Sequence, residues 1–266
     1  NSFVKFTGAA NPVQALTINT TTTLDNTTLA PNLGAGCTSG SSINVASGSG
    51  LDVSAIVGGG GSLIKTGQGQ LQFSGSQANT LATSTGVKQG SLFLNKVAGV
   101  QSLASTTVFI GDDTAGNSAT LDLGASGQLP TNVNLSVAST GAVNLDSNLS
   151  GNAQQINSLT LELGPVTSST VNLGAGTLTL TGNNVIVNAL GGGNPTAAAI
   201  NDGTLALNTY NNQTGVTRTF TVADGVSAGT GADLTITSAI VDGTGFAASN
   251  LTKTGLGDLE FDGITS

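Results

Sequence analysis

The sequence predicts an all-β protein in which short strands stack as the coils of one elongated β-solenoid. Units in which Leu, Val or Ile alternates with polar residues recur along most of the chain, and such alternation is typical of strands with one buried face. The 266 residues include 39 Gly, 8% charged residues and only 3% aromatic residues. This composition is too aliphatic for a disordered tail, and its few aromatic side chains favour a thin core lined by Leu, Val and Ile.

The strand-like units follow one another with turn-forming residues between them. They include residues 16–18, 44–45, 51–53, 71–73, 92–94, 108–110, 121–123, 133–135, 143–145, 159–163, 171–173, 178–180, 205–207, 220–222 and 234–236. No helical periodicity competes with these units. The glycine run at 58–61 is predicted to be a loop because strand patterning resumes at once. Residues 1–266 are therefore interpreted as a single β-solenoid domain.

The spacing of comparable positions suits coils of two or three strands. The interval from Leu121 to Val143 and the slightly shorter interval from Val143 to Leu161 are each interpreted as one coil. The main alternative is a β-sandwich, or a tandem pair of sandwiches, which also uses short alternating strands. The solenoid is favoured because no Asn-Gly hairpin signal occurs. Against it stand four Asp-Gly pairs, which begin at Asp202, Asp224, Asp242 and Asp262.

One motif occurs twice, at residues 62–75 and 250–263. Both copies read Leu-x-Lys-Thr-Gly-x-Gly-x-Leu-x-Phe-x-Gly. In the first copy Leu71 and Phe73 alternate with polar residues, so both are predicted to face the core while Gln72 faces outward. The ending Phe-x-Gly also appears near the start of the chain.

Together with the residues after its first copy, this motif resembles the passenger-associated repeat of bacterial autotransporters. That repeat runs Leu-x-Lys-x-Gly-x-Gly-x-Leu-x-Leu-x-Gly, then Asn-Thr, then Gly-x-Leu-x-Leu. Leu81 replaces the usual aromatic residue, and the second copy stops at Ser266. The resemblance covers about one eighth of the chain and implies a right-handed parallel β-helix that is exported to the bacterial surface. The matching residues are Leu63, Lys65, Gly67, Gly69, Leu71, Gly75, Asn79, Thr80, Gly90, Leu92 and Leu94, with Phe73 as an apolar substitute.

Charge and residue types disfavour several classes of function. The formal charge is -8, from 14 acidic and 6 basic residues, and nucleic-acid binding would require clustered Lys or Arg. No window is apolar over the length of a membrane span, so no membrane insertion of this segment is expected. Because the first residue is Asn, the chain is interpreted as a processed or excised piece. The lone Cys37 cannot form an internal disulfide and is interpreted as a tolerated loop residue.

Carboxylates are the only candidate catalytic groups. The chain has no His, and no Ser or Cys nucleophile has a recognisable partner. Carboxylates do the acid and base work in polysaccharide-cleaving β-helices, and the residues that could do so here are Asp112, Asp113, Asp258, Glu260 and Asp262. Asp112 and Asp113 are interpreted as solvated turn residues. A required acid at Glu260 or Asp262 is disfavoured because uncharged Gln72 and Ser74 occupy the equivalent positions of the first copy. No catalytic, cofactor or metal site is assigned, and the Asp-Gly pairs are interpreted as turns. Carbohydrate-binding sites commonly stack sugar rings on aromatic side chains, and this chain has one Tyr and no Trp, so a sugar-stacking surface is not favoured.

The residue types favour a non-catalytic structural or adhesive protein, and the resemblance implies that it is secreted or held at the bacterial cell surface. Loops at 34–42 and 191–196 would offer contacts to a host or neighbouring cell. The first alternative is a subunit that associates end to end into an extracellular filament, because neither terminus has the sequence of a polar cap over its strand edges. On the other account the chain is a segment of a longer surface protein. A polysaccharide-cleaving enzyme is the distant alternative.

Overall fold

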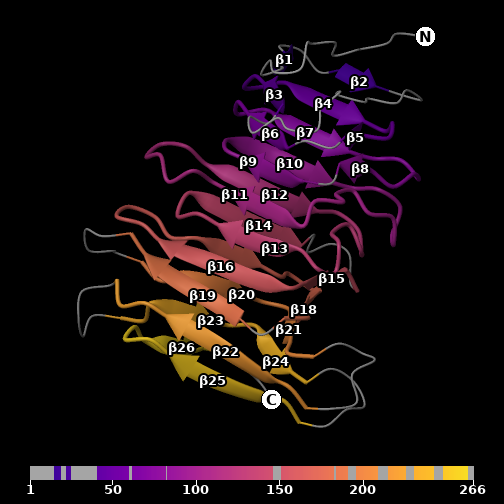
Figure 1. The fold of residues 1–266 in the computed structure, drawn as a ribbon. Helices are drawn as coiled ribbons and strands as arrows, with labels where there is room; N and C mark the ends of the chain where they lie inside the picture. The colour runs from indigo at the N-terminus through magenta and orange to yellow at the C-terminus, as the bar shows by residue number, and fades with distance from the viewer. Residues whose placement is uncertain are drawn as a thin grey trace.

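The computed structural model contains strands and turns but no helix within the part of the chain that it describes. It describes residues 15–18, 22–24, 41–59, 62–81, 83–145, 151–182, 184–190, 196–208, 215–225, 231–242 and 248–262. These residues form two long sheets of ten strands each, a third sheet of four strands and a short two-stranded pair. Figure 1 shows the strands stacked one above another along the length of the molecule.

Consecutive strands of each sheet lie side by side in the following order. The first sheet contains β1 (Ala15–Ile18), β3 (Ser41–Val45), β6 (Leu63–Thr66), β9 (Ser84–Val87), β11 (Thr107–Ile110), β13 (Asn134–Val137), β16 (Ser158–Leu163), β19 (Asn184–Ala189), β22 (Thr217–Val222) and β25 (Asn250–Thr254). The second sheet contains β2 (Thr22–Leu24), β4 (Gly50–Val53), β7 (Gln70–Phe73), β10 (Gly90–Leu94), β12 (Ala119–Leu123), β14 (Gly141–Leu145), β17 (Thr170–Asn172), β20 (Ala198–Asn201), β23 (Leu234–Ile236) and β26 (Leu259–Phe261). The third sheet contains β15 (Ala153–Ile156), β18 (Thr177–Leu180), β21 (Thr204–Ala206) and β24 (Ala239–Val241), and the short pair is β5 (Gly58–Gly59) with β8 (Thr80–Leu81).

The chain passes from the first sheet to the second in every coil. From β14 onward it adds a strand of the third sheet before it returns to the first. All pairings between these strands are parallel. The predicted parallel β-solenoid is therefore confirmed, and the β-sandwich alternative is wrong, because sandwich sheets are built from antiparallel strands. At a spacing of about 4.8 Å between strands, each long sheet makes a stack about 43 Å long.

The register confirms one of the two coil intervals taken from the sequence. Leu121 pairs with Val143 in the next strand of the second sheet. Val143 in turn pairs with Val171 in the strand after that, whereas Leu161 lies on the first sheet and pairs with Val187. The interval from Val143 to Leu161 was thus wrong as a coil length, because it compared strands of different sheets.

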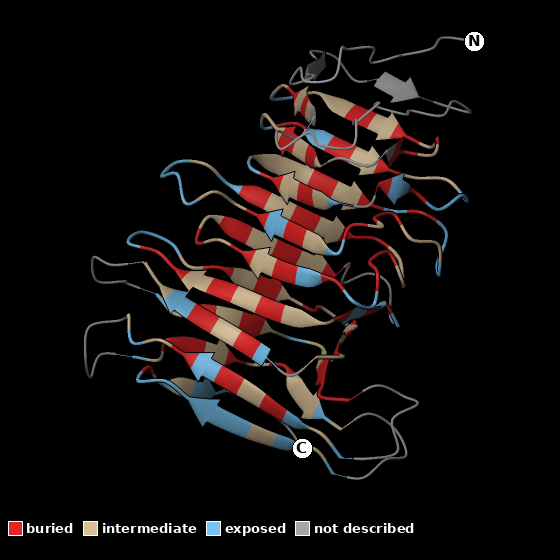
Figure 2. Ribbon diagram, in the orientation of Figure 1, coloured by how far each residue is buried: buried red, intermediate tan, exposed pale blue. Residues whose placement is uncertain are grey.

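The core is a narrow column of aliphatic side chains between the sheets. Along each strand buried residues alternate with partly exposed ones, which appear in Figure 2 as red bands separated by tan ones. In the second sheet one buried row, from β4 to β23, stacks a side chain of each coil on that of the next coil. This row contains Leu51, Leu71, Leu92, Leu121, Val143, Val171, Ile200 and Ile236.

The repeated motif forms the corner between the first and second sheets. Gly67 has a φ of 75°, in the left-handed region that favours glycine, and a Cβ there would lie 2.3 Å from the carbonyl oxygen of Val45 in the preceding coil. Gly255 in the second copy has a φ of 83°, and a Cβ there would lie 2.2 Å from the carbonyl oxygen of Val222. The glycine of Lys-Thr-Gly is therefore required by both the turn and the close approach of the coil beneath it.

The lysine of the motif is buried in the first copy. Lys65 is fully buried, and its Nζ donates hydrogen bonds to the carbonyl oxygens of Thr66, Gly67 and Gln89 at 3.0, 2.6 and 2.9 Å. Gln89 lies in the following coil, so the ammonium group joins two coils. Desolvation lowers the pKa of Lys65 to about 8. Lys96 is also buried, and its Nζ donates to the carbonyl oxygen of Ser74 at 2.7 Å.

The asparagine of the motif joins three coils where the chain has left the second sheet. Asn79 is buried, and its Oδ1 accepts a hydrogen bond from the backbone N–H of Val57 at 2.8 Å. Its Nδ2 donates to the carbonyl oxygen of Ser102, also at 2.8 Å. Buried Gln128 continues this polar column and accepts from Ser102 Oγ at 2.5 Å. These side chains satisfy buried backbone groups that strand pairing does not reach.

The two copies of the motif differ in burial, although they occupy equivalent strands. Leu71 and Phe73 are fully buried, as predicted, between the coils on either side. In the second copy Leu259 is only partly buried, and Phe261 is 47% exposed. Among the described strands, β25 and β26 form the last coil, so the second copy is covered from one side only.

Several sequence predictions lie outside the described residues. They concern Cys37, the start of the chain up to residue 14, and most of the loops at 34–42 and 191–196.

Candidate functional site

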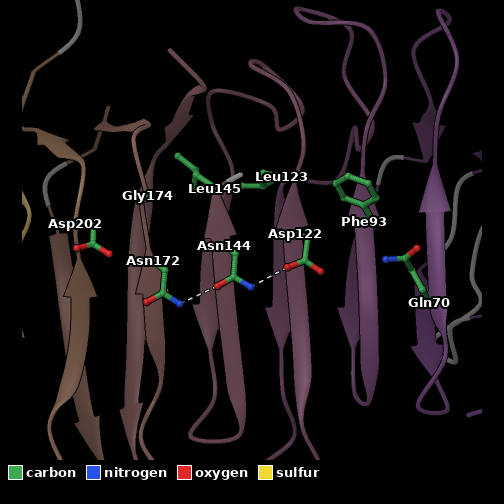
Figure 3. Close-up of a pocket in the computed structure, with 9 residues that line it drawn as sticks. All are labelled: Gln70, Phe93, Asp122, Leu123, Asn144, Leu145, Asn172, Gly174 and Asp202. Carbon is green, nitrogen blue, oxygen red and sulfur yellow. Dashed lines mark hydrogen bonds between the residues drawn. The ribbon is translucent and has the colours of Figure 1, made fainter. Parts of the chain in front are cut away.

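A polar groove crosses the outer face of the second sheet. It has a volume of about 460 Å³ and extends over six successive strands, from β7 to the end of β20. At about 4.8 Å per strand this is a length of about 24 Å. Figure 3 shows the polar residues in a row that crosses successive strands, with the ring of Phe93 beside Asp122. The groove is lined by Gln70, Phe93, Asp122, Leu123, Asn144, Leu145, Asn172, Gly174 and Asp202.

The centre of the groove is a ladder of amide side chains that starts at a carboxylate. Asn144 Nδ2 donates to Asp122 Oδ1 at 2.8 Å, and Asn172 Nδ2 donates to Asn144 Oδ1 at 2.8 Å (Figure 3). Asn201 Nδ2 extends the ladder by donating to Asn172 Oδ1 at 2.9 Å. Ser91 Oγ donates to the other carboxylate oxygen, Asp122 Oδ2, at 2.5 Å. The parallel register places these residues opposite one another, so the ladder follows directly from the stacking of similar units.

The ladder leaves hydrogen-bonding capacity on each amide. A primary amide has two N–H donors and two acceptor lone pairs, and the ladder uses one of each on Asn144 and on Asn172. Because both side chains belong to outward-facing, partly exposed positions, the remaining donors and acceptors are available to a ligand in the groove. The centre of the groove therefore presents one free N–H donor and one free acceptor lone pair in each of two neighbouring coils.

An aromatic ring borders the ladder. Phe93 is partly exposed on β10 and lies next to Asp122 in register. Its ring lies against Gly124, where an added Cβ would meet Phe93 Cε2 at 2.6 Å. The absence of a side chain at Gly124 thus provides the space that the ring occupies. Leu123 and Leu145 are buried below the ladder.

The charge of the groove is negative. Asp122 and Asp202 are charged, and none of the described residues that line the groove is Lys or Arg. Arg218 lies elsewhere, buried, where its Nε and Nη2 donate to the carbonyl oxygens of Leu207 and Leu180. An anionic ligand would therefore meet like charges from the described lining without a compensating cation.

The adjacent acids Asp112 and Asp113 lie together after β11 but bind different partners. Asp112 Oδ1 accepts hydrogen bonds from the backbone N–H of Thr114 at 3.1 Å and from Asn117 Nδ2 at 3.2 Å. Desolvation opposes the charged form of Asp112, but the hydrogen bonds from Asn117 and Thr114 and the charge of Lys88 outweigh it, so the pKa of Asp112 is lowered. Asp112 therefore stabilises its own turn, which agrees with its interpretation as a turn residue.

Asp113 pairs with a carboxyl group that the sequence did not place near it. Asp113 Oδ1 accepts hydrogen bonds from the backbone N–H and the Oγ of Ser139, both at 2.8 Å. Burial, a hydrogen bond with Asp113 and the negative charge of Asp113 together raise the pKa of Glu162 on β16 to about 7. The interaction joins the turn after β11 to β16, two strands further along the first sheet.

The acids of the second motif copy lie far along the stack from Asp112 and Asp113. Glu260 and Asp262 are exposed at the last described coil, and the backbone N–H of Asp258 donates to Asp233 Oδ2 at 2.8 Å. The five carboxylates considered from the sequence are therefore not brought together. Over the described ranges no three His, Cys, Asp or Glu side chains are grouped closely enough to hold a metal ion. Asp202 and Gly203 both have positive φ, 57° and 53°, as expected of the predicted Asp-Gly turn.

The groove was not predicted from the sequence, although its signal was present. The strand-like units at 121–123, 143–145 and 171–173 each carry a polar residue between two apolar ones, and these central residues are Asp122, Asn144 and Asn172. Alternation alone indicates that each faces outward. Their alignment into one row depends on the register between coils of unequal length, which no local pattern reveals.

No helix in the described ranges is long and apolar enough to cross a membrane. In comparisons with known proteins, no protein-family model, no curated protein and no solved structure matches the chain.

Proposed function

We propose that this chain is a non-catalytic, adhesive β-solenoid of the bacterial cell surface or its surroundings. The observation that carries this proposal is the continuous groove over six coils on the outer face of the second sheet. A regular stack offers a long, preformed contact surface, and repeat proteins commonly bind through such extended faces. The resemblance of residues 62–94 to the passenger-associated repeat supports export to the cell surface.

The buried polar groups support a structural purpose for many of the charged residues. Lys65, Lys96 and Arg218 are all buried and bonded to backbone carbonyl groups. Asp112 and Asp113 bind the turns of their own and the next coil. These groups hold the coils together, and their geometry gives no support to the alternative of a polysaccharide-cleaving enzyme.

The test is display of residues 1–266 on the surface of a non-adherent bacterium. We expect the displaying cells to attach to cultured epithelial cells or to other bacteria several-fold more than cells that carry the same anchor without this chain. Purified chain added in solution should compete with this attachment. If attachment does not exceed that of the anchor control on any of these surfaces, the proposed adhesive function is refuted.

End-to-end association into a filament is a second candidate, favoured by the exposure of the last described coil. Phe261 is 47% exposed and Lys253 is exposed, whereas Phe73 and Lys65 at the equivalent positions inside the stack are fully buried. A strand pair from a second copy, laid on β25 and β26, would cover these side chains and pair the strand edges. Light scattering and electron microscopy over a concentration series test this: end-to-end species are expected, and a strictly monomeric chain at high concentration would exclude them.

A further inference from the structure

We propose that the groove on the second sheet binds a neutral glycan that lies along the axis of the solenoid. This inference rests on the proposed adhesive function and names the class of ligand. A sugar ring with its glycosidic oxygen is about as long as the spacing between neighbouring strands, about 4.8 Å. An extended glycan along the axis would therefore meet an equivalent set of protein groups at each successive ring.

The amide ladder supplies those groups. Asn144 and Asn172 each retain an N–H donor and an acceptor lone pair after their hydrogen bonds within the ladder. Neighbouring hydroxyl groups of a sugar are donors and acceptors in the same close arrangement, so a single amide can bond both. The hydrogen bonds within the ladder hold the amides in place before the ligand binds, which reduces the entropy lost on binding.

Phe93 supplies the apolar contact that sugar recognition also uses. The ring is partly exposed at one end of the ladder, next to Asp122. The apolar face of a sugar ring can pack against such an aromatic side chain while its hydroxyl groups turn toward Asp122 and the amides. Because Phe93 is the one aromatic residue among the described lining residues, recognition would depend mainly on hydrogen bonds.

The charge and the backbone pairing of the groove argue against other ligands. Asp122 and Asp202, with no cation among the described lining residues, would repel phosphates and polyuronates. An extended peptide would bind a sheet by pairing with a free strand edge. The strands β12, β14 and β17 at the centre of the groove are paired on both sides and offer no free edge.

The experiment titrates the purified chain with cellohexaose, xylohexaose, maltohexaose and hexagalacturonate, and binding is measured by saturation-transfer NMR. We expect at least one of the neutral hexamers to bind and hexagalacturonate to bind more weakly than that hexamer. Phe93→Ala should weaken the binding of the neutral hexamer about five- to ten-fold, since an aromatic contact contributes about 1 kcal/mol. Asn144→Leu should weaken it similarly.

Matched variants on the other sheet serve as controls. Phe109 is a 49% exposed phenylalanine on β11, and Asn188 is an exposed asparagine on β19, both on the outer face of the first sheet. Phe109→Ala and Asn188→Leu should leave binding unchanged. Circular dichroism melting shows whether each variant is folded, and Phe93→Ala keeps the test decisive if Asn144→Leu is unstable, because Phe93 lies outside the core.

Three results would overturn the inference: no binding of any neutral hexamer, binding that Phe93→Ala and the control variants reduce equally, or tighter binding of hexagalacturonate than of the neutral hexamers. The surface-display assay separates this inference from the adhesive function. If displaying cells attach but no neutral hexamer binds, the glycan assignment fails while the adhesive function stands. If neutral hexamers bind but displaying cells do not attach, the adhesive function fails.

Discussion

Replacing one phenylalanine in each copy of the motif measures how much a covering coil contributes to stability. Phe73 is fully buried between Val53 and Leu94, its register partners in the coils on either side. Phe73→Ala removes the ring and leaves a cavity that the flanking coils can only partly close, so we expect a loss of about 3 to 5 kcal/mol in the free energy of unfolding. Urea denaturation followed by circular dichroism measures this loss.

The equivalent residue of the second copy is the control. Phe261 is 47% exposed and, among the described strands, has a register partner on one side only, Ile236. Because about half of its surface is already in water and no enclosed cavity forms, Phe261→Ala should cost about 1 to 2 kcal/mol. Gln72→Ala, on the outer face beside Phe73, should change stability by no more than about 0.5 kcal/mol. Equal losses for Phe73→Ala and Phe261→Ala would refute the claim that burial between two coils decides the energy.

Three further predictions concern buried charges and the corner turn. Lys65 has a pKa of about 8 in the folded protein, against an ordinary value of 10.5. Between these values the unfolded chain binds more protons than the folded protein, so the free energy of unfolding should rise with pH across that window. Denaturation of Lys65→Met should show a smaller rise, and an unchanged pH profile would contradict the assignment. Glu162 has a pKa of about 7 in the folded protein, against an ordinary value of 4.5. Between these values the folded protein binds more protons than the unfolded chain, so its stability should fall as the pH rises from 4.5 to 7. Denaturation of Glu162→Gln across this window should show a flatter profile, and an equally steep fall would assign the effect to another group. Gly90 and Gly99 have similar positive φ of 72° and 81°, but a Cβ at Gly90 would lie 2.4 Å from a carbonyl oxygen whereas a Cβ at Gly99 would meet no atom within 4 Å. Gly90→Ala should therefore lower the melting temperature clearly more than Gly99→Ala, which bears only the backbone strain of about 1 kcal/mol, and equal shifts would show that the close approach is not important.

Part of the motif's structural role could be predicted from the sequence because it depends only on neighbouring residues in the chain. Alternation at Leu71 and Phe73 predicts which side chains face inward, and the structure confirms both. The glycine at Gly67 also has a local reason, since the chain must turn there with positive φ. Its second reason is the carbonyl oxygen of Val45, which occupies the space that a Cβ at Gly67 would need; it belongs to the preceding coil and is visible only in the structure.

The sequence shows that the lysine and the asparagine of the motif match the repeat pattern, but it does not reveal their structural roles. A lysine in a strand is usually expected to reach solvent, yet Lys65 is fully buried against three carbonyl groups from two coils. Asn79 likewise bridges backbone groups of the coils before and after it. Both roles depend on atoms that lie a whole coil away in the chain, so no local pattern could predict them.

The sequence by itself therefore determined the all-β class, the stacked coils and the inward side of each strand. These properties depend on a period of two along each strand and on composition, and both can be seen within a few residues. Tertiary structure decided the register, because coils of unequal length align only where their strands pair, as the short coil from Leu51 to Leu71 and the much longer one from Ile200 to Ile236 both do. The groove follows from that register: Asp122, Asn144 and Asn172 are ordinary outward-facing residues in three separate strands, and they become one ladder only when parallel pairing places their side chains within hydrogen-bond distance.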